Sequence, residues 1–178
     1  MKYLSDYNIF NESLETPAPI KWSVGSNKIK GVFYIGEEGE YKEKYVIVAK
    51  KFPEYQELNV WNFKFYWNDG GDIIVKLTGL NKGKFKILST IVDGFKYILS
   101  KRPDGITFIA DVNEDSRIKF YNTLCKKAEE KYGLKLSKFI TKTKEGNAMA
   151  YCLYNDDRNR DFITKTFGEL VPKMKKIG

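Results

Sequence analysis

The chain has 178 residues, of which 42% are hydrophobic and 15% aromatic, so it can bury a sizeable core and is not a disordered chain. Its 31 basic and 23 acidic residues leave a net charge of +8, which favours anionic partners such as nucleic acid, nucleotides and phosphorylated cofactors. The absence of histidine excludes Ser-His-Asp and Cys-His catalysis, and two cysteines are too few for a disulfide framework or a four-ligand metal site.

The N-terminal 18 residues are predicted to form a polar arm, because they carry Pro17 and show no sustained hydrophobic period. Residues 19–178 contain no repeat, low-complexity tract or long linker, so we expect a single domain. No apolar run approaches the length of a membrane span, and the first residues lack the apolar block of a secretory signal. We therefore expect no membrane partner and no secretion through a signal peptide.

The first half of the domain is predicted to consist of strands. Residues 58–67 alternate strictly, with Trp61, Phe63, Phe65 and Trp67 on one face, which is typical of a strand with one buried side. Exposed aromatic residues beside lysines would also suit single-stranded nucleic acid, but strict alternation favours a core role. Earlier strands are expected at 20–24, 28–35 and 45–49, with hairpin turns at 36–39 and 68–71.

The segment from Asp72 to Gly133 reads as strand, glycine turn, helix, strand and helix. Strands are predicted at 72–78 and 105–111, and helices at 85–101 and 114–132; Asp115 or Ser116 is expected to cap the second helix and Gly133 to end it. A strand-turn-helix unit directs free backbone N–H groups at an anion above the turn. Residues 76–102 also hold seven basic residues and one acid.

Two strands at 136–143 and 148–154 and a last helix at 158–174 complete the expected mixed α/β sheet. Cys125 on a predicted helix and Cys152 on a predicted strand are expected to be reduced, partly buried thiols.

The order of elements over residues 58–155 resembles the core of GNAT-type N-acyltransferases. The segments that carry this resemblance are Lys76-Leu-Thr-Gly-Leu-Asn81 and Asn113-Glu-Asp-Ser-Arg-Ile-Lys-Phe-Tyr121, each of which opens a helix. Phe108-Ile-Ala-Asp111 followed by Ser116-Arg-Ile-Lys-Phe-Tyr121 is also similar to GNAT-like proteins encoded by tailed bacteriophages. The resemblance implies a mostly antiparallel central sheet with flanking helices.

The resemblance further implies that acetyl-CoA or another acyl-CoA is the cofactor and that an amine is the acceptor. No metal is expected, because the chain has no histidine and only two cysteines. Backbone amides of the loop hold the pyrophosphate in that family, with Gly79 at the family's glycine. The loop residues expected to bind the cofactor are Lys76, Gly79, Asn81, Lys82, Gly83 and Lys84. Tyr121 matches the position of a tyrosine that protonates the departing thiolate.

A base for the attacking amine must be a carboxylate in a chain without histidine, and Asp111 and Asp72 are the best placed. Two alternatives stay open. One is a GNAT-like phage protein without catalysis that acts as a virion component or binds a host protein, and the other is a basic nucleic-acid-binding domain. The expected location is the host cytoplasm or the virion.

Overall fold

The computed structural model describes residues 16–36, 42–55, 57–67, 83–143 and 146–173. These residues form seven strands, three α-helices and a short 3-10 turn. The strands are β1 (Lys21–Val24), β2 (Lys28–Ile35), β3 (Glu43–Lys51), β4 (Val60–Trp67), β5 (Gly105–Asp111), β6 (Lys135–Thr143) and β7 (Gly146–Tyr154). The helices are α2 (Lys84–Leu99), α3 (Asp115–Tyr132) and α4 (Asp157–Leu170), and the 3-10 turn is Val171–Lys173.

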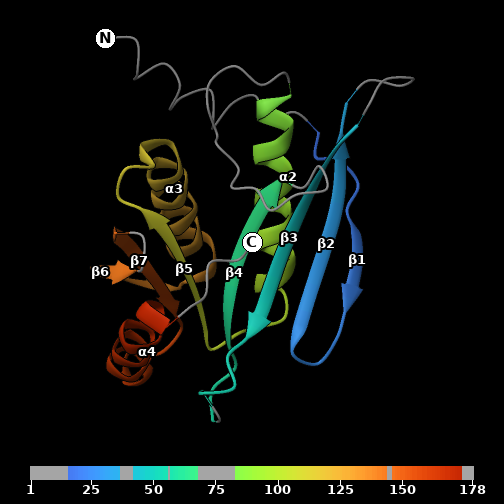
Figure 1. The fold of residues 1–178 in the computed structure, drawn as a ribbon. Coiled ribbons are helices and arrows are strands. Elements are labelled where there is room, and N and C mark those ends of the chain that lie inside the picture. Colours follow the sequence, from blue (N-terminus) through green and yellow to red (C-terminus); the bar gives the residue numbers. More distant parts are fainter. Residues whose placement is uncertain (1–15, 37–41, 56, 68–82, 144–145, 174–178) are drawn as a thin grey trace.

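All seven strands belong to one sheet in the order β1-β2-β3-β4-β5-β7-β6 (Figure 1). Every neighbouring pair is antiparallel except β4 and β5, which run parallel. A parallel pair needs a crossover connection, and α2 provides it. The predicted fold class, a mixed α/β fold with a mostly antiparallel central sheet and flanking helices, is confirmed.

The helices cover both faces of this sheet. Helix α2 packs against β2 and β3, α3 packs against β5 and β6, and α4 packs against β6 and β7. Alternate residues of β7 separate the two layers, because Tyr151 and Leu153 join the core of α2 and α3 whereas Cys152 and Tyr154 join the core of α4. Since successive side chains of a strand point to opposite faces, α4 lies on the face opposite α2 and α3.

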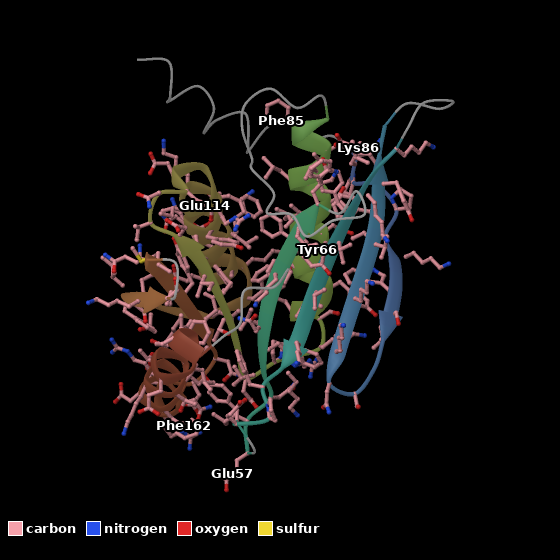
Figure 2. All side chains as sticks on the ribbon, viewed as in Figure 1. Glu57, Tyr66, Phe85, Lys86, Glu114 and Phe162 are labelled. Atoms are coloured by element: carbon pink, nitrogen blue, oxygen red, sulfur yellow. The ribbon has the colours of Figure 1, made fainter. Side chains whose placement is uncertain are left out.

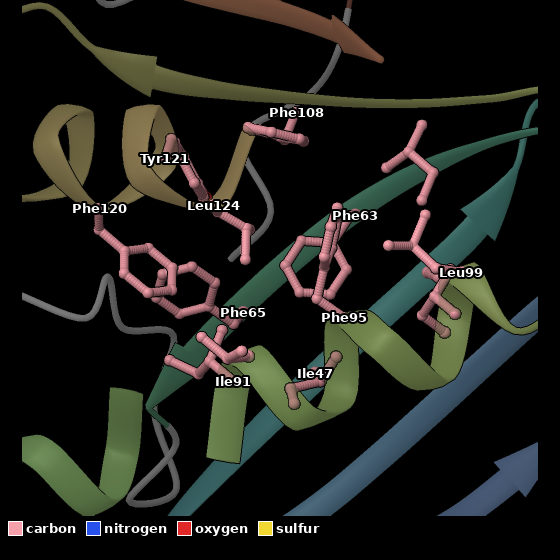
Figure 3. Packing of buried hydrophobic residues seen from close by; sticks show 14 of the residues in the cluster. Ile47, Phe63, Phe65, Ile91, Phe95, Leu99, Phe108, Phe120, Tyr121 and Leu124 are labelled. Atoms are coloured by element: carbon pink, nitrogen blue, oxygen red, sulfur yellow. The ribbon is translucent and has the colours of Figure 1, made fainter. Parts of the chain in front are cut away.

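The alternation in residues 58–67 predicted a strand with a buried aromatic face, and β4 has this face. Trp61, Phe63 and Phe65 are buried in the larger core, where Phe63 meets Phe95 of α2 edge to face with ring centroids 5.2 Å apart (Figure 3). The aromatic face of β4 is therefore core, and it does not offer a stacking platform for bases. Cys125 and Cys152 are both free and buried, as expected.

The helix ends agree with the sequence in one place and differ in another. Gly133 ends α3 in the left-handed conformation, with φ of 65°, and its N–H bonds the carbonyl of Glu129. The prediction that Asp115 or Ser116 caps α3 is wrong, because the N-cap is Glu114 and no side chain caps the helix. The last helix ends at Leu170, before Met174, and a 3-10 turn containing Pro172 follows.

Several predictions lie outside the described residues. These are most of the arm, the strand at 72–78 and the loop at 79–82. Ala18 is described and is 3% exposed, and its N–H donates a 2.9 Å hydrogen bond to Thr90 Oγ1 of α2. No described helix combines the length and hydrophobicity needed to cross a membrane.

Candidate functional site

Strands β4 and β5 separate along their length, and we call this feature the fork. Their parallel pairing covers only three positions, from Val60 opposite Gly105 to Asn62 opposite Thr107. Beyond these positions the arms of the fork, residues 63–67 of β4 and 108–111 of β5, have no pairing with each other. Figure 1 shows the two strands diverging toward the ends at which α2 and α3 begin. Ligands of open α/β sheets bind outside the carboxyl ends of parallel strands, which is where this fork opens.

Polar contacts fasten the closed end of the fork. Asn59 N donates a 2.7 Å hydrogen bond to Asp104 Oδ2, and Asp104 N donates a 2.9 Å bond to the carbonyl of Asn59. Three residues further along, in β4, the side-chain Nδ2 of the buried Asn62 lies 3.3 Å from both the carbonyl and the hydroxyl oxygen of Thr107. Both strands are therefore tied together before they diverge.

An aromatic cluster fills the helix side of the fork (Figure 3). Tyr121 of α3 contacts both arms, because its ring centroid lies 5.9 Å from Phe65 of β4 and 4.5 Å from Phe108 of β5. Tyr121 is 3% exposed, and its burial raises the pKa of the phenol well above its usual value. The phenol therefore keeps its proton at neutral pH, and it is a weaker acid than an exposed tyrosine.

The start of α2 stands at the open end of the fork. Gly83 is its N-cap with φ of 81°, and the first turn contains no acidic residue. Lys84 is the first residue of the helix, and Lys86 follows in the same turn, near the upper end of α2 in Figure 2. Free N–H groups and lysines at one helix end create a positive potential that favours an anion.

Trp67 ends β4 at the same side of the sheet. Its indole Nε1 is enclosed and has no hydrogen-bond acceptor in the described structure. An enclosed donor without an acceptor costs about 1 to 3 kcal/mol. A ligand atom can accept this hydrogen bond only if the side chains around the indole shift, and it would then recover that cost.

The start of α3 forms the other side of the opening. Asp111 Oδ1 accepts a 2.8 Å hydrogen bond from Asn113 N, so this carboxylate stabilises the turn after β5. Glu114 accepts a 3.3 Å bond from Asp111 N and forms a 3.1 Å ion pair with Arg117. The Arg117 guanidinium lies 5.5 Å from the Phe65 ring, so it reaches from α3 to the β4 arm.

Two of the predicted site residues lie at the fork. Tyr121 contacts both arms and Asp111 ends the β5 arm, whereas Gly83, which precedes Lys84 at the start of α2, lies beside Ile35 of β2. The other predicted loop residues, Lys76, Gly79, Asn81 and Lys82, and the second candidate base, Asp72, lie outside the described residues.

Sequence reasoning missed three residues at this place. These are Trp67, Glu114 and Arg117. The spacing of Glu114 and Arg117 by three residues at a helix start was a signal for an ion pair. Nothing in the sequence indicated that the Arg117 guanidinium would pack on the Phe65 ring of β4.

The outer face of β4, opposite α2 and α3, carries Lys64. Burial lowers the pKa of Lys64 to about 8, and the like charge of Lys50 on β3 adds to the effect. A lysine with this pKa exchanges a proton near neutral pH, which an ordinary surface lysine does not.

Comparison with known proteins gives a likeness in fold only. No protein-family model matches the chain, and a search of curated proteins finds no match. Among solved structures, a point mutant of spermidine N-acetyltransferase SpeG from Vibrio cholerae has 8% sequence identity and a TM-score of 0.46, over 90% of this chain and 78% of the other. A chimera of that enzyme with hSSAT has 7% identity and a TM-score of 0.45, over 71% and 68%.

The CoA-dependent acyl-homoserine lactone synthase MesI is a third similar structure, with 10% identity and a TM-score of 0.35, over 94% of this chain and 88% of the other. These likenesses concern the arrangement of elements, and no residue role is taken from them. The site therefore stands on the geometry of this chain: a mixed α/β sheet that opens at the parallel pair β4 and β5, with two helix starts at the opening.

Proposed function

We propose that this protein binds an acyl-CoA at the fork and transfers the acyl group to an amine. The observation that carries the proposal is the loss of pairing between β4 and β5 after Asn62 and Thr107. The facing edges of the two arms do not pair with each other, so their backbone N–H and C=O groups could pair with an extended occupant. The pantetheine part of coenzyme A is such an occupant, because it is a narrow chain with two amide groups.

The phosphates of the cofactor would lie at the start of α2. The helix end supplies roughly half a positive charge, and Lys82 and Lys84 add theirs to the amides after Gly79. The enclosed indole N–H of Trp67 is a further donor at this end of β4. Lys76, Asn81 and Gly83 complete the proposed cofactor loop.

The proposed reaction forms a C–N bond between the amine and the thioester carbonyl carbon and breaks the C–S bond. The amine loses one proton, for which Asp111 is the proposed base. The departing thiolate gains one proton, for which Tyr121 is the proposed donor. Burial raises the pKa of this phenol and so weakens it as an acid, which means that the transfer requires a thiolate whose basicity is raised in the same dry site.

A second candidate is a GNAT-like module that binds a ligand or a protein without catalysis, as a virion component or against a host protein. Two observations favour it. Tyr121 is enclosed by four aromatic rings, and the Asp111 carboxylate already bonds its own turn. Both residues thus have structural roles that do not need a reaction.

Binding of acetyl-CoA tests the two candidates together. At a concentration of about 100 times the dissociation constant, the ligand stabilises the fold by about 2.7 kcal/mol, which raises the melting temperature by about 5 to 10 °C for a chain of this size. No shift at millimolar acetyl-CoA would overturn the proposal. A shift without release of free thiol in the presence of an amine panel would support the non-catalytic module.

Two tryptophan variants locate the ligand. Trp67→Phe removes the enclosed indole N–H and keeps an aromatic ring, so it should weaken acetyl-CoA binding without destabilising the free protein. Trp61→Phe is the matched control, since Trp61 Nε1 already donates a 2.7 Å hydrogen bond to Asn59 Oδ1. That control should lower stability and leave the affinity for acetyl-CoA unchanged. Equal effects of both variants on affinity would place the ligand elsewhere.

A further inference from the structure

Helices α2 and α3 lie on the same face of the sheet but cover different halves of it. Helix α2 packs on β2 and β3, whereas α3 packs on β5 and β6. Both helices also reach the fork between these halves, since Phe95 of α2 contacts Phe63 and Phe108, and Tyr121 of α3 contacts Phe65. A groove of about 330 Å³ remains between the two helices. Its walls come from later turns, Val92 to Lys96 of α2 and Leu124 to Tyr132 of α3, and not from the helix starts at the fork.

The floor of this groove is apolar. Val92, Phe95, Leu124 and Ala128 line it, and each is 5% exposed or less, because the core packs behind them. Tyr132 stands at the wall and is 42% exposed, which is high for a large aromatic side chain. The volume is at the lower end of the range for small-molecule sites, and apolar lining is typical of such sites.

The rim of the groove is positively charged. Lys96, Lys127 and Lys131 line it together with one acid, Glu130, whose carboxylate lies 3.9 Å from the ammonium of Lys126. Three lysines beside an apolar floor complement a molecule that has an anionic end and an apolar body. A neutral apolar ligand would form no ion pair with the rim lysines, and inorganic phosphate would make no apolar contact with the floor.

We propose that the α2–α3 groove binds a small amphiphilic anion, of the class of a medium-chain carboxylate. A groove of about 330 Å³ is large enough for a carboxylate on a chain of about eight carbons. The apolar chain lies on the Phe95 and Leu124 floor, and the carboxylate lies among the rim lysines. This proposal does not depend on acyl transfer at the fork.

Calorimetric titration of the full chain with octanoate tests the proposal. Octanol and inorganic phosphate are the two comparison ligands, since each has one half of the chemistry. We expect saturable binding of octanoate in the millimolar range or tighter, and binding at least about tenfold weaker for both comparison ligands. Absence of octanoate binding, or equal binding of octanol, would overturn the proposal.

Variants place the ligand in the groove. The double change Lys96→Glu and Lys131→Glu reverses two exposed rim charges and should weaken octanoate binding by at least about tenfold. The matched control is Lys21→Glu with Lys165→Glu, which changes the net charge equally at exposed positions on β1 and α4. Equal loss of affinity in both double variants would reduce the effect to net charge and overturn the assignment to the groove.

The second test measures octanoate binding by a variant whose groove floor is blocked. Ala128→Phe enlarges a floor side chain that is 2% exposed, so octanoate binding should be lost, the melting temperature should fall, and thermal unfolding should stay cooperative. Retention of full affinity in a folded Ala128→Phe variant would show that the ligand lies elsewhere. Binding of acetyl-CoA by the same variant should be unchanged, since the fork is a separate site.

Discussion

Two substitutions of Tyr121 separate its packing role from its proposed chemical role. Tyr121→Phe removes the hydroxyl and keeps the ring between the two arms of the fork. Tyr121→Ala removes the ring as well. Packing depends on the ring and proton donation on the hydroxyl, so Tyr121→Phe should lower turnover alone, whereas Tyr121→Ala should lower both stability and turnover.

The expected magnitudes follow from the surroundings of the ring. Tyr121 is 3% exposed, and its centroid lies between 4.5 and 5.9 Å from the rings of Phe65, Phe108, Phe120 and Tyr151. Truncation of a buried aromatic residue to alanine costs about 3 to 5 kcal/mol, and four aromatic neighbours place this site in the upper part of that range. Tyr121→Phe should change stability by no more than about 1 kcal/mol.

Urea unfolding followed by fluorescence of the three tryptophans measures stability, and release of free thiol from acetyl-CoA measures turnover. If Tyr121 is the proton donor, Tyr121→Phe lowers turnover by about 100- to 10,000-fold. Because the pKa of Tyr121 is raised, wild-type turnover should show no alkaline loss from this group up to about pH 10. Full turnover by Tyr121→Phe would refute the donor role, and a cost below about 1.5 kcal/mol for Tyr121→Ala would refute the packing argument.

Three further predictions concern stability. Phe108 is fully buried beside three aromatic rings, so Phe108→Ala should lower the unfolding free energy in urea by about 3 to 5 kcal/mol. Phe162 is 51% exposed, so Phe162→Ala should lower it by less than about 1 kcal/mol. Similar losses in the two variants would contradict the assignment of the core. Gly83→Ala should lower the unfolding free energy by about 1 to 2 kcal/mol, because φ is 81° and the new Cβ would lie 2.8 Å from a methyl group of Ile35. In the control Gly25→Ala, the new Cβ meets only the carbonyl of Lys28 at 3.4 Å, so stability should stay within about 1 kcal/mol of the wild type. Lys64 has a pKa of about 8 in the folded protein against an ordinary value of 10.5, so the unfolded chain binds more protons and the unfolding free energy should rise between about pH 8 and 10.5. Lys64→Met should therefore be more stable than the wild type below pH 8, and this advantage should shrink between pH 8 and 10.5. An advantage that does not depend on pH would contradict the lowered pKa.

The fold was largely predictable because most elements carry a clear hydrophobic period. The alternation at Trp61, Phe63 and Phe65 predicted β4 and its buried face, and the stripe from Leu88 to Phe95 predicted α2. The start of α3 was less predictable. Sequence rules for N-caps weigh the capping side chain alone, whereas Glu114 is held by its contacts with Asp111 and Arg117.

The candidate site was predictable only in part, because its residues come from elements that are distant in sequence. Tyr121 and Asp111 were found through their positions in a local segment. The approach of Arg117 to Phe65 joins residues that are more than fifty positions apart, and no local period encodes such a contact. The enclosure of the Trp67 indole and the groove between α2 and α3 likewise depend on how whole layers pack.

The fork itself results from two opposing features of the sequence. At the closed end, Asp104 bonds both the N–H and the C=O of Asn59, which fixes the two strands at sheet spacing. At the open end, the Tyr121 ring contacts Phe65 on one arm and Phe108 on the other, so it fills the space between these two side chains as a spacer on the helix side of the sheet. If the arms closed to the usual strand spacing of about 4.8 Å, these two side chains would move together and the ring would have to shift. It follows that Tyr121→Ala should lose acyl-CoA binding together with stability, because the arms can then approach and pair. Tyr121→Phe, which keeps the spacer, should bind acyl-CoA as the wild type does.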